Sequence, residues 1–210
     1  LVRTRLGALD IHSYCLHMPI PFFNNRMSFL KRFAKWMSKN YPDVPVNMSE
    51  WTHMQGGRDK GMDSALVTAN VMYEDLSVLN VISWQHWIAV SEVNYCDGLI
   101  YINLDDKTFE MTKRYYVTGN FSKYVPAGSV RVDAACDDPE LRLLAFKYDG
   151  GCAVIVINST EKEKELSLPE QYSAVKSAVT DDNNNLCEYD IADPGYIKIT
   201  PRSVTTIILR

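Results

Sequence analysis

The chain has 210 residues, of which 46% are hydrophobic and 23% charged, and its formal net charge is −4. This length and composition suit one large domain or two small ones with a buried core. The slightly negative charge and the scattered basic residues argue against nucleic acid and anionic membrane as partners. No apolar run approaches the roughly 20 residues that a membrane span needs.

The first 124 residues alternate short apolar runs with helix-like stretches, the pattern of βα units around a parallel sheet. A helix is predicted within RMSFLKRFAKWMSKN, because apolar residues recur there at helical spacing and Pro42 marks its end. Further helices are predicted over 63–76 and 112–124, and strands over 6–14, 44–51 and 77–85.

After residue 125 the pattern changes to short β-prone segments separated by the turn signals DGG, STE, DDNNN and DPG. This pattern is typical of an antiparallel β-sandwich. The predicted strands lie in SVRVDAAC, LRLLAFKY, CAVIVIN, KELSLP, YIKIT and SVTTIILR. The expected fold class is therefore α/β followed by all-β, with one domain over residues 1–124 and a second over 125–210.

The five cysteines are widely spaced and form no Cys-x-x-Cys pair. The sequence therefore predicts neither a disulfide framework nor a zinc site, and most of these residues are expected to be buried free thiols. The N-terminal LVRTRLGALD has neither an initiator Met nor the apolar centre of a signal peptide, so the compartment stays unknown.

Polar and aromatic residues gather where the three predicted parallel strands end, in DIHSY, MSEW and SWQHW. Ligand sites of parallel α/β sheets lie at these carboxyl ends. The residues are His12, Tyr14, Glu50, Trp51, Trp84, Gln85, His86 and Trp87. Aromatic rings beside a carboxylate and hydrogen-bonding side chains are the chemistry of a carbohydrate site. Each residue also has a structural interpretation, as a hydrogen-bonding partner, an ion-pair partner or a core aromatic.

These motifs, with YYVTGNFSKYVPAGSVRV and the terminal SVTTIIL, resemble the C-terminal half of glycoside hydrolase family 30. That family includes glucosylceramidases, β-1,6-glucanases, β-1,6-galactanases and glucuronoxylanases. The resemblance covers essentially the whole chain and implies a (β/α)8 barrel with a β-sandwich on its side. This chain then holds barrel strands six to eight and most of the sandwich, and the missing N-terminal half of the barrel is an expected partner.

The resemblance also implies roles for individual residues. Glu50 resembles the catalytic nucleophile at the end of strand seven, and His12 and Tyr14 resemble the strand-six residues that border it. Trp84 resembles the strand-eight tryptophan that forms the floor of the sugar subsite. The other expected substrate-binding residues are Trp51, Gln85 and Trp87.

The implied reaction is hydrolysis of a β-linked glycan with retention, which uses two carboxylates and no metal or organic cofactor. The acid/base glutamate belongs to strand four, which this chain lacks, and nothing in the family pattern supports Glu92 or Asp97 as a substitute. The chain alone is therefore expected to be inactive. The alternative is a non-catalytic carbohydrate-binding remnant.

The glycan stays open between β-1,6-galactan, β-1,6-glucan, xylan and a β-glucoside. The loop IAVSEVNYCDGLI has no obvious arginine for a glucuronic acid branch, which argues mildly against glucuronoxylan. A secreted or cell-surface location is compatible with such a substrate. Three sequons occur, at Asn47, Asn120 and Asn158. Asn47 lies in a predicted buried strand, and none of the three is taken as evidence of glycosylation.

Overall fold

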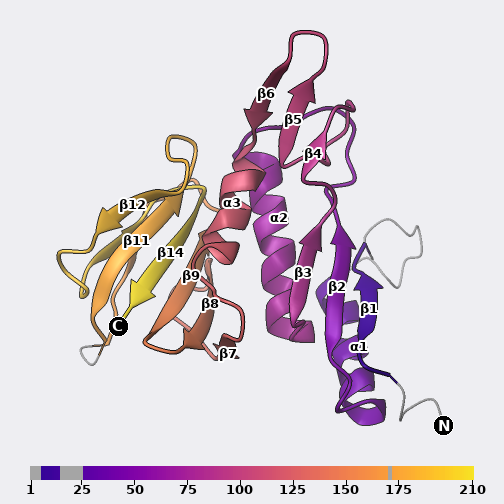
Figure 1. Cartoon of the computed structure of the whole chain (residues 1–210). Coiled ribbons are helices and arrows are strands. Elements are labelled where there is room, and N and C mark those ends of the chain that lie inside the picture. The colour runs from indigo at the N-terminus through magenta and orange to yellow at the C-terminus, as the bar shows by residue number, and fades with distance from the viewer. Residues whose placement is uncertain (1–5, 15–25, 170–171) are drawn as a thin grey trace.

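A computed structural model of the chain describes residues 6–14, 26–169 and 172–210. Its N-terminal part contains a parallel sheet of three strands in the order β1-β2-β3 (Figure 1). The strands are β1 (Leu9–His12), β2 (Val46–Trp51) and β3 (Ser83–His86). Helix α1 (Arg26–Asn40) lies between β1 and β2 in the chain, and α2 (Met62–Glu74) lies between β2 and β3. The alternation of strands and helices is the one that the sequence predicts.

The third parallel strand begins later than the sequence predicts. Residues Asp75–Leu79 form a π-helical extension of α2, labelled η2, and the strand begins only at Ser83. The expected strand over 77–85 is thus wrong over its first six residues, 77–82. A short apolar run fits a buried helix end as well as a strand. Here Asn80 ends the helix in the left-handed conformation, with a φ of 53°.

A second three-stranded sheet, which the sequence did not predict, follows β3. It consists of β4 (Val90–Ser91), β5 (Ile100–Asn103) and β6 (Thr108–Met111), and β5 and β6 form a hairpin that projects from the body (Figure 1). Helix α3 (Lys113–Ser122) comes next. Its N-cap is Thr112, whose side chain accepts a hydrogen bond from the backbone N–H of Tyr115.

The C-terminal part contains an antiparallel sheet of six strands in the order β12-β11-β14-β9-β8-β7 and a separate pair, β10-β13. The strands are β7 (Val130–Val132), β8 (Leu141–Tyr148), β9 (Gly151–Asn158), β10 (Lys164–Leu166), β11 (Ala174–Thr180), β12 (Cys187–Asp190), β13 (Ile197–Ile199) and β14 (Ser203–Leu209). Each of the six predicted segments contains a strand. The sequence missed β11 and β12, which carry few large apolar side chains.

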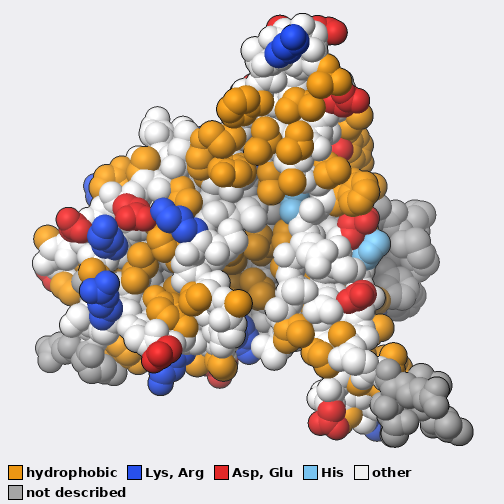
Figure 2. Space-filling view, in the orientation of Figure 1, with side chains coloured by type: hydrophobic (Ala, Val, Ile, Leu, Met, Phe, Trp, Pro, Cys, Tyr) orange, Lys and Arg blue, Asp and Glu red, His pale blue; other side chains and the backbone are white. Residues whose placement is uncertain are grey.

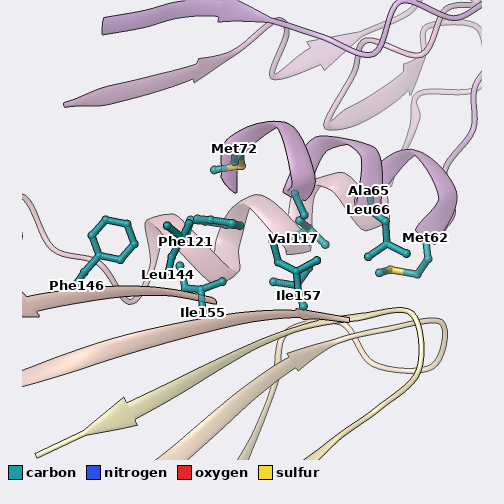
Figure 3. Packing of buried hydrophobic residues seen from close by; sticks show 12 residues of the cluster. Met62, Ala65, Leu66, Met72, Val117, Phe121, Leu144, Phe146, Ile155 and Ile157 are labelled. Carbon is teal, nitrogen blue, oxygen red and sulfur yellow. The ribbon is translucent and has the colours of Figure 1, made fainter. Parts of the chain in front are cut away.

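Helices α2 and α3 lie between the parallel sheet and the six-stranded sheet (Figure 1). The apolar residues of α2 recur at helical spacing and pack with α3 against β8, β9 and β14 (Figure 3). The buried residues of this cluster are Met62, Ala65, Leu66, Ala69, Met72, Val117, Phe121, Leu144, Phe146, Ile155, Ile157 and Val204. The core therefore continues across residue 125, where the sequence pattern changes.

A second apolar cluster fills the space between the other face of the six-stranded sheet and the β10-β13 pair. A third lies under the parallel sheet, where Leu30 and Met37 of α1 meet Met48 of β2. None of the helices in the described ranges is long and apolar enough to cross a membrane.

Candidate active site

The parallel sheet has one apolar face and one polar face. Val46 and Met48 of β2 are buried in the cluster beneath the sheet. On the other face, Asn47 Nδ2 donates to Asp10 Oδ1 at 2.8 Å, and Ser83 Oγ donates to Asn47 Oδ1 at 2.9 Å. Since successive side chains of a strand point to opposite faces, these polar contacts define the face on which the rest of the site lies.

Glu50 continues this polar face at the end of β2. The hydroxyl of Tyr14 donates to Glu50 Oε1 at 3.2 Å, and Nδ1 of His12 lies 3.6 Å from the same oxygen. His12 pairs with Glu50 across a β-bulge, in which β2 advances two residues while β1 advances one. The side chains of His12 and Glu50 are 52% and 30% exposed. The structure thus brings together the three residues expected at the nucleophile.

The phenol of Tyr14 is held in its protonated form. Its pKa is raised to about 12, first because of burial and then because of the neighbouring Glu50 carboxylate. At neutral pH Tyr14 is therefore a hydrogen-bond donor to Glu50, and it restricts the orientation of that carboxylate.

Two more of the expected residues are exposed near the same strand ends. Gln85 is exposed on β3, two residues beyond Ser83 and so on the polar face by the strand period. The indole of Trp87 is 51% exposed, and its backbone N–H donates to the carbonyl of Trp51 at 2.9 Å. Trp87 therefore lies directly beside the end of β2 that carries Glu50.

Trp51 and Trp84 lie elsewhere, which corrects their expected placement. Trp51 is only 3% exposed and belongs to the cluster beneath the sheet, with its ring centroid 5.9 Å from that of Trp84. Trp84 pairs with the buried Met48, and its Nε1 donates to Asp75 Oδ2 at 3.0 Å. Strand alternation directs both indoles away from Glu50, so neither offers a face to a ligand bound there.

Trp84 and His86 border a cavity of about 590 Å³ between β3, α2, α3 and the segment around β7. The ring of His86 contacts the backbone carbonyl of Asp97 through Nε2 at 2.8 Å. Burial lowers the pKa of His86 to about 4, so the ring is neutral near pH 7. His86 therefore has a structural role on the apolar side of the sheet.

Hydrophobic side chains gather on the surface near β4, β5 and β6 (Figure 2). Cross-strand pairing places Val90, Ile100, Ile102, Phe109 and Met111 on one face of this small sheet. Phe109 is 70% exposed. The loop after β3 thus adds an apolar surface at the end of the molecule where the parallel strands finish.

A buried polar cluster lies on the opposite side of the sheet from Glu50, and sequence reasoning missed it. Asp75 is fully buried, and its carboxylate accepts hydrogen bonds from Ser13, Arg26 and Trp84. Burial raises the pKa of Asp75, while the charge of Arg26 opposes that increase. The only signal in the sequence was an acidic pair, Glu74 and Asp75, inside an otherwise apolar helix end.

The three sequon asparagines are engaged in hydrogen bonds. Asn120 and Asn158 are fully buried, and their amides donate to the backbone carbonyls of Ala178 and Lys162 at 2.9 and 2.8 Å. Asn47 is bonded within the polar face described above. Among the described residues, no group of three or more His, Cys, Asp or Glu side chains is arranged to hold a metal ion.

Known proteins resemble this chain in sequence. Residues 35–101 match the family model described as O-Glycosyl hydrolase family 30. The lysosomal acid glucosylceramidase of Mus musculus is 27% identical over 159 residues, which cover 70% of this chain and 28% of that protein.

Solved structures share the fold. A conserved exported protein from Bacteroides fragilis superposes with a TM-score of 0.79 at 17% identity, over 97% of this chain and 46% of that one. The catalytic domain of GH30 xylanase C from Talaromyces cellulolyticus gives a TM-score of 0.70 at 18% identity, over 80% of this chain and 41% of that one. The chain thus spans less than half the length of each of these relatives.

Proposed function

Since the chain belongs to glycoside hydrolase family 30, we propose that it is the C-terminal part of a retaining β-glycosidase. In this proposal Glu50 is the nucleophile, and Tyr14 and His12 orient its carboxylate. The substrate is a β-linked glycan, and the acid/base carboxylate belongs to a part of the protein upstream of this chain.

The observation that carries the proposal is the arrangement around Glu50. Tyr14 and His12 both contact Oε1, while Oε2 accepts no hydrogen bond from the described part of the chain. A nucleophilic carboxylate needs one oxygen fixed and the other free to approach the anomeric carbon. Glu50 meets both conditions on an exposed polar face.

In the first step Glu50 Oε2 attacks the anomeric carbon, and the bond from that carbon to the leaving oxygen breaks as an acid protonates this oxygen. In the second step water, deprotonated by the same residue, releases the sugar from the Glu50 ester. Retaining enzymes keep the two carboxyl groups about 5–5.5 Å apart. Asp97, which lies between β4 and β5, is only 7% exposed and is not available to a substrate.

The edges of the parallel sheet support the upstream location of the second carboxylate. Within the described residues, β1 and β3 each pair only with β2. Their outer edges therefore offer unpaired N–H and C=O groups, which a closed barrel pairs with further strands. Without the acid the chain loses a contribution of about 10²–10⁴ to the rate, so the 210 residues alone do not hydrolyse a glycoside.

Trp87 and Gln85 complete the proposed sugar site. Trp87 has an exposed indole, and its backbone bonds to Trp51, the residue after Glu50. An exposed indole at this position can stack on the C–H face of a sugar ring, and an amide can hydrogen-bond to the sugar hydroxyls. Trp87 therefore replaces Trp84 as the aromatic platform. Among β-1,6-galactan, β-1,6-glucan, xylan and β-glucosides, the described loops do not favour one.

The second candidate is a carbohydrate-binding remnant without hydrolytic activity. It is favoured by the exposed Trp87 together with the lack of an identified acid within the described residues. It predicts that a glycan binds to the protein with its upstream part and is not cleaved.

The stereochemistry of the product tests the proposal. A longer protein that includes the upstream part is incubated with aryl β-glycosides, and the anomers released are followed by proton NMR before mutarotation. We expect the β-anomer to form first. An α-anomer formed first contradicts a Glu50 ester intermediate, and binding without any hydrolysis supports the second candidate.

A further inference from the structure

The pairing of β1 with β2 does not by itself fix the orientation of His12 and Tyr14. Strand β1 has only four residues, and its register with β2 shifts between Ile11 and His12. Tyr14 lies two residues beyond the end of the strand. A slip of one residue turns every side chain to the opposite face, and a short irregular strand resists such a slip weakly.

Ser13, between these two residues, is fixed on the other side of the chain. It is 1% exposed, and its hydroxyl donates to Asp75 Oδ2 at 2.9 Å. Nη2 of Arg26 donates both to Ser13 Oγ at 2.9 Å and to Asp75 Oδ1 at 2.6 Å. Three buried polar side chains are therefore hydrogen-bonded to one another at this single position.

Asp75 also holds the strand on the far side of Glu50. Its Oδ2 accepts the indole N–H of Trp84, which lies on β3. The same carboxylate thus bonds the end of β1 and the middle of β3, the two neighbours of β2. The cluster extends to the six-stranded sheet, because Glu74 accepts from Arg26 at 2.6 Å and from Arg142 of β8 at 3.2 Å.

We propose that Asp75, Arg26 and Ser13 form a cluster that positions the nucleophile, and that this cluster acts through Ser13. When Ser13 is fixed beneath the sheet, strand alternation places its neighbours His12 and Tyr14 on the polar face, where they contact Glu50. Ser13 acts through His12 and Tyr14 and touches no substrate. This inference rests on the proposed function, since it assigns a catalytic purpose to the orientation of Glu50.

The test is Ser13→Ala in the longer protein. A carboxylate displaced by about 1 Å costs up to roughly 10²-fold in rate. We expect kcat to fall by about 10–100-fold on that basis, with KM nearly unchanged because Trp87 and Gln85 are untouched. In a crystal structure of the variant, the contacts of Tyr14 and His12 with Glu50 Oε1 are expected to be lost or lengthened.

Ser203→Ala is the matched control. Ser203 is fully buried, and its hydroxyl donates to the carbonyl of Thr200 at 2.6 Å in the C-terminal part. Both variants remove one buried hydroxyl, so both lose stability, and only Ser13→Ala is expected to lower kcat. In a Tyr14→Phe background the effect of Ser13→Ala on kcat should shrink, because the two residues act through one contact.

Equal kcat values for Ser13→Ala and Ser203→Ala, with Tyr14 still bonded to Glu50, overturn the inference. Full additivity of Ser13→Ala and Tyr14→Phe overturns it as well. If the longer protein hydrolyses no glycoside, the proposed function fails on its own. The crystal structures of the wild type and Ser13→Ala then decide the positioning: retained contacts at Glu50 contradict it, and lost contacts support it.

Discussion

The parallel sheet and the six-stranded sheet differ in how completely each is built. Strands β8 and β9 have eight residues each, are paired on both sides and have apolar clusters on both faces. Strands β1 and β3 have four residues each, pair on one side only within the described residues, and have one polar face. The six-stranded sheet thus has the more complete core, while the parallel sheet carries the residues proposed for catalysis, and α2 packs against both layers.

The largest difference between the two sheets is expected at Glu50, on the parallel sheet. Replacing Glu50 by Gln removes the charge and the capacity to form a glycosyl ester. We expect kcat of the longer protein to fall by at least about a thousandfold. Glu92→Gln, in the exposed loop after β4, is the control and should leave kcat unchanged. Near-normal turnover of Glu50→Gln contradicts its role.

In the six-stranded sheet, shortening a buried core side chain should lower the free energy of unfolding rather than kcat. Ile155 of β9 is fully buried, so Ile155→Ala should lower the free energy of unfolding by about 2–5 kcal/mol. Ile82, just before β3, is 67% exposed, and Ile82→Ala should change that free energy by less than about 0.5 kcal/mol. Urea denaturation of the chain measures both. Equal losses would break the distinction between the layers.

His86 predicts a pH dependence of stability that belongs to the parallel sheet. Its pKa is lowered from 6.5 to about 4 because of burial, so the unfolded chain binds this proton more readily than the folded one. The stabilisation is complete above about pH 6.5 and is lost as the pH falls toward 4, by up to about 3 kcal/mol. The free energy of unfolding, measured by urea denaturation between pH 4 and 7, should vary less with pH for His86→Gln than for the wild type. An identical slope in both proteins contradicts the assignment.

The smallest expected effect concerns the aromatic platform. Trp87→Ala should weaken glycan binding to the longer protein by roughly 1–3 kcal/mol, because a stacking surface is lost. Trp36 of α1, at 50% exposure, matches the 51% of Trp87 and provides the control variant Trp36→Ala. Isothermal titration calorimetry compares the two. Equal losses of affinity would mean that Trp87 has no special place in the site.

The sequence predicted the order of elements because periodicity and turn residues are local signals. It predicted Glu50, His12 and Tyr14 through family motifs, and the structure brings these three together. It placed Trp84 on the wrong face, because only the pairing with Met48 shows which side chains of β3 point beneath the sheet. A strand as short as β3 carries too few residues for the alternation to reveal its buried face.

Long-range polar contacts also could not be predicted from the sequence. Ser13 and Asp75 are 62 positions apart, and neither residue type signals a partner at that distance. The prediction of a strand over 77–85 was wrong for a related reason. An apolar run can be buried at a helix end as well as in a strand, so burial does not distinguish the two. The bulge opposite His12 likewise depends on pairing, and it keeps Glu50 on the polar face while Trp51 turns inward.

The most direct test of the account is to trap the intermediate on Glu50. The longer protein is treated with 2-deoxy-2-fluoro β-glycosides of the gluco, galacto and xylo series, which slow release of the sugar from a retaining enzyme. Peptide mass spectrometry then locates the covalent sugar. The account predicts an ester on Glu50 and no labelling of Glu50→Gln. A sugar attached to any other carboxylate would contradict it.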